Sequence, residues 1–144
     1  MANMANTAAY KLPDGRLAVN VDSAKILAAE DSGYVQNVIS DAAATIVTIP
    51  ATAVVGIWTI RNGGAPQTGT PAGAVDDGHA VVIDPSDDDT LAGLDVEGDE
   101  ANGMKLTNTA ATARYGDEIT IINTGATDGG LIHAVKGTWE RETE

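Results

Sequence analysis

The chain has 144 residues, with 21 acidic and 8 basic side chains and a net charge of −13 at pH 7. This balance argues against nucleic-acid binding, which needs clustered lysine and arginine to neutralise phosphates. Cysteine is absent, so disulfides and thiolate metal sites are excluded. No apolar run approaches the length of a membrane span, so we expect no membrane partner and a cytosolic or virion-borne protein.

The predicted core is built from valine, isoleucine, leucine and alanine, because phenylalanine is absent and aromatic residues make up only 3% of the chain. Small side chains bury less apolar area, which stabilises a fold by about 25 cal/mol per Å². We therefore expect the chain to pack against copies of itself or another protein. The residues predicted to form the core or a subunit interface are Ile49, Trp58, Ile60, Ile119, Ile121 and Trp139.

The first half of the chain predicts an arm followed by short strands. Residues 1–10 are small and polar and predict an extended arm that is ordered only on a partner. A Pro-Asp-Gly turn at 13–15 precedes a strand at 17–21, where apolar residues alternate with others. Asp22 and Ser23 predict a cap for a turn or two of helix at 24–30, closed by Gly33. Residues 34–39 return to a strand pattern.

Two β-branched runs, at 46–50 and 57–60, predict two further strands. The second run ends at Asn62-Gly63-Gly64 and is echoed later in the chain. Residues 58–64 and 119–125 share the pattern Thr-Ile-x-Asn-x-Gly. The echo suggests that one kind of strand-and-turn unit is used twice.

The second half predicts loops around three more strands and an edge strand. Residues 63–78, rich in glycine, proline, alanine and threonine, form the clearest loop. A short strand at 79–83 leads into an acidic, irregular stretch that reaches Gly103 and includes a turn at 86–93. An edge strand is expected at 104–108, and strands at 118–123 and 131–136 precede a charged tail.

Several of these motifs, in this order, resemble a pattern of tailed-phage capsid decoration (cement) proteins. The pattern consists of a Leu-x-x-x-Asp-Ser-Gly-x-Val segment, a Val-Thr-Leu-Pro-Ala strand and a Gly-aromatic/apolar-Thr-Ile strand. Tyr34 stands where that pattern has lysine. The residues that carry the resemblance are 27–35, 47–51, 56–60, 108–113, 116–120 and 137–139.

The resemblance implies a homotrimer that binds the major capsid protein on the outer surface of the head. Because asparagine, alanine and threonine suit a peptide that completes a sheet edge, we predict that the arm contacts the capsid. The loop at 63–78 is a further candidate. The arm residues predicted to make this contact are Met1, Asn3, Met4, Asn6, Thr7, Tyr10 and Lys11.

Candidate chemistry is confined to the acidic residues between Asp84 and Glu100, which lack the spacing of an EF-hand. We interpret them as a solvated acidic loop that binds no metal. The two histidines, His79 and His133, lie in apolar runs and favour a structural role. Five tryptophan and tyrosine residues are too few to line the substrate cleft of a glycosidase. We therefore interpret the protein as a non-enzyme without a cofactor.

These observations predict an all-β fold, either a β-sandwich or a jelly-roll-like barrel with an extended N-terminal arm. The expected division is an arm, short strand and helical turn at 1–33, a β domain at 34–140 and a charged tail at 141–144. The function implied by the resemblance is a structural cement protein of the phage head. The alternative is a receptor- or carbohydrate-binding module of a tail fibre, and a small acidic hydrolase is the third hypothesis.

Overall fold

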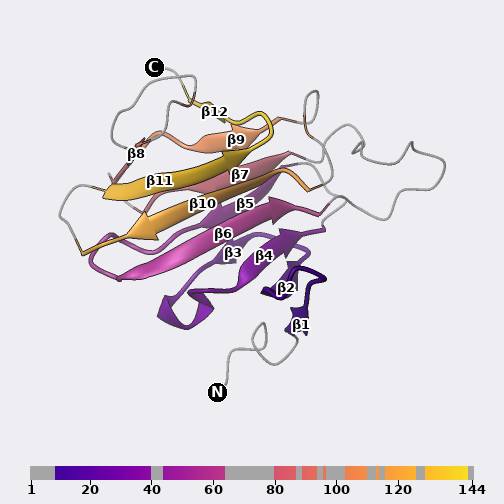
Figure 1. The fold of residues 1–144 in the computed structure, drawn as a ribbon. Helices are drawn as coiled ribbons and strands as arrows, with labels where there is room; N and C mark the ends of the chain where they lie inside the picture. The colour runs from indigo at the N-terminus through magenta and orange to yellow at the C-terminus, as the bar shows by residue number, and fades with distance from the viewer. Residues whose placement is uncertain are drawn as a thin grey trace.

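In the part of the chain that the structure describes, two β-sheets pack face to face, and this computed structural model confirms the all-β prediction (Figure 1). The structure describes residues 9–39, 44–63, 80–86, 89–93, 96, 103–109, 113, 116–125 and 129–142. Within this part of the chain, no helix is both long and apolar enough to cross a membrane. The only helical segment described is a single 3₁₀ turn, η1 (Ala29–Asp31).

Sheet A has seven strands in the order β1, β2, β4, β6, β10, β11, β8, and sheet B has five in the order β12, β9, β7, β5, β3. The strands of sheet A are β1 (Tyr10–Lys11), β2 (Leu17–Val21), β4 (Val35–Val38), β6 (Gly56–Asn62), β8 (Thr90–Gly93), β10 (Glu118–Asn123) and β11 (Gly129–Lys136). Those of sheet B are β3 (Lys25–Ile26), β5 (Thr45–Thr48), β7 (Val81–Asp84), β9 (Leu106–Asn108) and β12 (Glu140–Arg141).

From β2 to β7 the chain winds as a coil, with successive strands alternating between the two sheets. β2, β4 and β6 therefore pair in parallel within sheet A, and β3, β5 and β7 pair in parallel within sheet B. Parallel neighbours need a crossover between them, and here the strand in the opposite sheet supplies it. The result is a β-sandwich whose first half does not follow the antiparallel order of a jelly roll.

The later strands close the sandwich mainly by antiparallel pairing. β10 lies between β6 and β11 and is antiparallel to both, while β9 is antiparallel to β7 and to β12. The echoed segments thus become neighbours, with Thr59 directly opposite Thr120. In Figure 1 the layer that contains β6, β10 and β11 lies in front of the layer that contains β5, β7 and β9.

The core lies between the sheets and consists of aliphatic side chains around Trp58 and Trp139. In β6, Trp58, Ile60 and Asn62 are buried and alternate with more exposed neighbours, as the period of a strand requires. The six residues predicted for the core or a subunit interface, which are Ile49, Trp58, Ile60, Ile119, Ile121 and Trp139, are all at least 96% buried within the single chain.

The prediction of a helical segment at 24–30 is wrong for most of these residues. Lys25 and Ile26 instead pair in parallel with Val47 and Thr48 of β5, and only Ala29–Asp31 forms a helical turn. Its capping contact also differs, because Asp31 Oδ2 accepts the backbone N–H of Ala28 at 2.9 Å. Tertiary pairing has overridden a local preference for helix.

The ends of the described chain belong to the sheets. Tyr10 and Lys11, at the end of the predicted arm, form β1 at the edge of sheet A. Arg141, the first residue of the predicted charged tail, is buried in β12, where its guanidinium donates to the carbonyls of Leu91 and Val96. β1 is held by its pairing with β2, and β12 is held by its pairing with β9.

Buried asparagines hold the strand ends in place. Asn62 at the end of β6 donates to Asn108 Oδ1 at 2.7 Å, and Asn108 donates to Asp117 Oδ2 at 3.0 Å. Asn123, which corresponds to Asn62 in the echoed motif, donates to the Pro50 carbonyl at 2.9 Å. Because buried amides need hydrogen-bond partners, these contacts specify where the strands stop.

Candidate protein-contact surface

The outer side of sheet A carries three rows of side chains across β6, β10 and β11. In β6 and β10 these residues alternate with buried neighbours, although Thr120 is itself only 9% exposed, and the strand register aligns them with residues of β11. We call these nine residues the contact face. The rows are Ile57, Ile122 and Leu131, then Thr59, Thr120 and Ala134, then Arg61, Glu118 and Lys136.

The first row forms an apolar end of the contact face. Ile57 is 39% exposed and Leu131 is 44% exposed, which is high for large aliphatic side chains in a sheet. Val55, just before β6, is 67% exposed. A flat sheet surface that leaves such side chains in water is suited to cover by another protein.

The middle row consists of small side chains, two of them hydroxyl-bearing, and a β-bulge borders it. The hydroxyl oxygens of Thr59 and Thr120 lie 3.2 Å apart and hydrogen-bond across the strands. Ala134 pairs with Thr120 while Ile132 pairs with the next residue of β10, so His133 is the extra residue of a bulge in β11. His133 is exposed, contrary to the structural role predicted from its apolar run.

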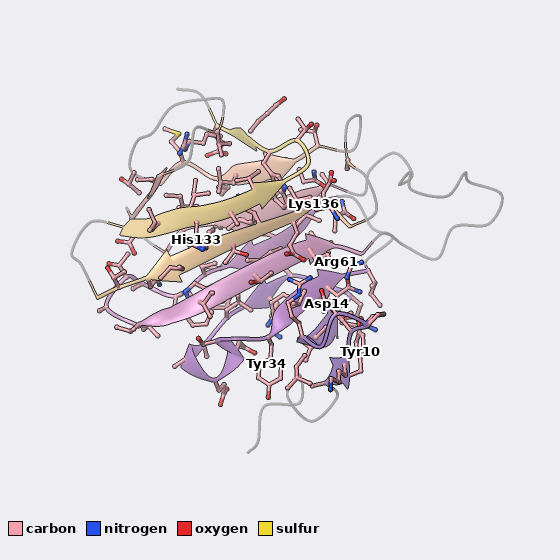
Figure 2. The ribbon with its side chains drawn as sticks, viewed as in Figure 1. Tyr10, Asp14, Tyr34, Arg61, His133 and Lys136 are labelled. Carbon is pink, nitrogen blue, oxygen red and sulfur yellow. The ribbon has the colours of Figure 1, made fainter. Side chains whose placement is uncertain are left out.

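The third row forms a charged end, and a loop reaches across the sheet to it. Arg16, in the hairpin that joins β1 to β2, donates to Glu118 Oε2 and to Asp14 Oδ2, each at 2.8 Å. The guanidinium of Arg61 and the ammonium of Lys136 both approach Gly116, since a Cβ placed there would lie 3.8 and 3.9 Å from them. Figure 2 shows Asp14, Arg61 and Lys136 at the same end, with His133 farther along β11.

The hydrogen bonds of this end shift two pKa values. The backbone N–H of Arg16 is the main cause that lowers the pKa of Asp14 below its usual range, with help from the Arg16 guanidinium. The carboxylate of Glu118 is the main cause that raises the pKa of Arg16. Both shifts favour the charged forms of the groups that hold the hairpin against the charged end.

The two outer surfaces of the sandwich differ in charge. Three of the eight basic residues, Arg16, Arg61 and Lys136, gather at the charged end beside Asp14 and Glu118. The outer side of sheet B exposes Ile26 and Ile46, and in its described strand residues it carries Asp84 and Glu140 without a cation. In a protein with a net charge of −13, the described residues of the contact face therefore repel an acidic partner less than those on the outer side of sheet B.

Of the seven predicted capsid-contact residues, the structure describes two. Tyr10 and Lys11 form β1, and the Tyr10 hydroxyl donates to Asn20 Oδ1 at 2.6 Å. Asn37 Nδ2 donates to that hydroxyl at 3.2 Å. The other five, Met1, Asn3, Met4, Asn6 and Thr7, lie outside the described residues, as does most of the predicted loop at 63–78.

The predicted acidic loop is described only in part. Asp84 ends β7, and Asp89 Oδ2 accepts the backbone N–H of Thr52 at 3.1 Å. Across the described residues, no group of three or more histidine, cysteine, aspartate and glutamate side chains is placed to hold a metal ion. His79 and the acidic residues Asp87, Asp88, Asp95, Glu97, Asp99 and Glu100 lie outside the described part.

No protein-family model matches this chain, and neither a curated protein nor a solved structure matches it. The contact face was not predicted from the sequence, although the echoed Thr-Ile-x-Asn-x-Gly motif contained a signal for it. Thr59 and Thr120 occupy the same place in the two copies of the motif, and they face each other at the centre of the face.

Proposed function

We propose that the protein is a structural component of a tailed-phage virion that binds the outside of the head and stabilises the capsid shell. Its partners are the major capsid protein and copies of itself in a homotrimer. It acts by binding these partners and converts no substrate. The contact face of sheet A is the surface that meets the shell.

The exposed apolar row, on the same face as the charged end, is the observation that carries this proposal. Burial of Ile57 and Leu131 against a shell protein supplies affinity, because apolar area removed from water stabilises a contact. Arg61 and Lys136 at the other end of the face attract carboxylates of the partner. This combination of apolar and charged contacts is typical of protein interfaces.

The resemblance to decoration proteins supports the proposal through residues that build the scaffold. Leu27, Asp31 and Val35 of the first motif are all buried around the β3–β4 connection. Trp58 and Trp139, from later motifs, lie in the core. The likeness therefore rests on residues that shape the sandwich, while the contact face supplies the surface for the shell.

A carbohydrate-binding module of a tail fibre receives no specific support from this surface. Sugar sites usually stack the ligand on exposed aromatic rings, whereas Trp58 and Trp139 are 0% and 4% exposed. The contact face contains no aromatic side chain among its nine residues.

Co-sedimentation with purified heads that lack the protein tests the proposal. We expect Leu131→Asp to weaken binding about tenfold or more, since a tenfold change corresponds to only about 1.4 kcal/mol. The matched control is Ile26→Asp on the outer side of sheet B, where Ile26 is 79% exposed. We expect the control to bind like the wild type. Failure of the wild type to bind would contradict the function, and unchanged binding by Leu131→Asp would contradict the assigned face.

A further inference from the structure

Lys25, Asp31 and Gln36 form a trio that bridges the two sheets. Lys25 lies on β3 of sheet B, and its Nζ donates to Gln36 Oε1 on β4 of sheet A at 2.8 Å. Asp31 Oδ1 lies 3.4 Å from the same Nζ. One amine therefore contacts both a side-chain amide and a carboxylate.

The amide and the carboxylate of the trio are buried. Gln36 is 0% exposed, and its Nε2 is buried without a hydrogen-bond partner. The side chain of Asp31 is 2% exposed, and its Oδ2 accepts the backbone N–H of Ala28 while Oδ1 faces the amine. A buried amide nitrogen without a partner is rare in a folded protein and asks for an explanation.

We propose that the trio forms an autocatalytic isopeptide bond between Lys25 Nζ and the side-chain carbonyl carbon of Gln36. The Lys25 ammonium gives a proton to Asp31, and the neutral amine attacks the Gln36 carbonyl carbon to form a tetrahedral intermediate. The C–Nε2 bond then breaks. The departing nitrogen takes one proton from the former Lys25 amine and leaves as ammonia, which then takes up the proton that Asp31 received. The products are a secondary amide, an ammonium ion and the regenerated Asp31 carboxylate, so atoms and charge balance without an oxidant.

Three features of the site suit this reaction. The Lys25 amine already contacts the Gln36 amide oxygen and the Asp31 carboxylate, which lowers the entropic cost of bringing the three groups together. The Nε2 atom of Gln36, which leaves as ammonia, has no hydrogen bond that must be broken first. The Lys25 side chain keeps 21% of its surface exposed, so ammonia formed beside it has a short way to solvent.

The bond would join the sheets covalently in a chain that has no cysteine for a disulfide. β3 is a two-residue edge strand of sheet B, paired to β5 on one side only. A bond from Lys25 to Gln36 joins two residues that are 11 positions apart in the sequence. It links the edge strand β3 of sheet B covalently to the interior strand β4 of sheet A. The inference concerns the chain itself and does not rest on the proposed role in a virion.

Mass spectrometry of the full chain, kept folded for several days at neutral pH and then denatured, tests the proposal. The expected mass is about 17 Da below that of the sequence, because each bond releases one ammonia. Trypsin cannot cleave at an acylated lysine, so residues 17–61 should appear as one peptide in place of 17–25 and 26–61. A protease that cleaves after Glu30, between the two linked residues, should leave the halves joined.

Variants assign the bond to the trio. Lys25→Arg and Asp31→Asn should keep the full mass, whereas Lys105→Arg, a lysine outside the trio, should still lose about 17 Da. Full mass in the wild type, with release of a free 17–25 peptide, would overturn the proposal. So would a mass loss that maps to other residues or persists in Lys25→Arg.

Discussion

A methyl group added at Gly137 should destabilise the fold through the buried Asp117. Gly137 follows β11 with a φ of +91°, and a Cβ at this position would lie 2.2 Å from Asp117 Cγ and 2.3 Å from its Oδ1. Gly15 provides the matched control. Its φ is +92°, and an added Cβ there would meet nothing within 4 Å.

The two substitutions share one cost and differ in another. Alanine in a left-handed conformation costs about 1–2 kcal/mol at either site. At Gly137 the alanine must also push Asp117 away from Asn108, which holds Asn62 in turn. Leaving buried polar groups unpaired costs about 1–3 kcal/mol more. We therefore expect a loss of about 2–5 kcal/mol for Gly137→Ala and about 1–2 kcal/mol for Gly15→Ala.

Urea denaturation at pH 7 and one fixed protein concentration measures this difference, because stability of an oligomer depends on concentration. The expected result is a clearly lower midpoint for Gly137→Ala than for Gly15→Ala, with similar slopes. Equal midpoints for the two variants would refute the role assigned to Asp117.

Three further predictions concern the core, the hairpin and the arm. In urea denaturation, Trp58→Ala should lower the free energy of unfolding by about 3–5 kcal/mol. Trp58→Phe should lower it much less, because the indole Nε1 has no hydrogen-bond partner to lose. Equal losses of stability in the two variants would contradict this reasoning. The folded-state pKa of Asp14 is lowered, so its small contribution to stability is present above the unfolded value of about 3.9 and is lost as pH falls through the folded value. NMR titration of Asp14 should show this depressed pKa, and an ordinary value would contradict the contact with Arg16. A chain lacking residues 1–8 keeps β1 and should fold and assemble normally but bind heads poorly, whereas undiminished co-sedimentation would leave the arm without a role.

Local patterns were sufficient to predict the long strands. Alternation in β6 and β10 appears directly in the sequence, because one side of each strand is buried and the other faces outward. The burial of Trp58 and Ile121 follows from the same period. The shortest elements could not be predicted. β8 and β12 exist because they pair with β11 and β9, and Lys25 and Ile26 are strand residues only beside β5.

The contact face and the coil of parallel strands depend on register between distant segments. Ile57, Ile122 and Leu131 lie in one row only after β6, β10 and β11 have paired. Nothing near Lys25 in the sequence indicates that its amine meets Gln36 from the other sheet. Such arrangements are set by non-local packing, which single-sequence patterns do not encode.

Cryo-electron microscopy of the intact virion that contains this protein tests the central claim most directly. The account predicts sandwich-shaped density in many copies on the outer surface of the head, with β6, β10 and β11 turned toward the shell. Density confined to the tail, or particles that carry none of this protein, would contradict it.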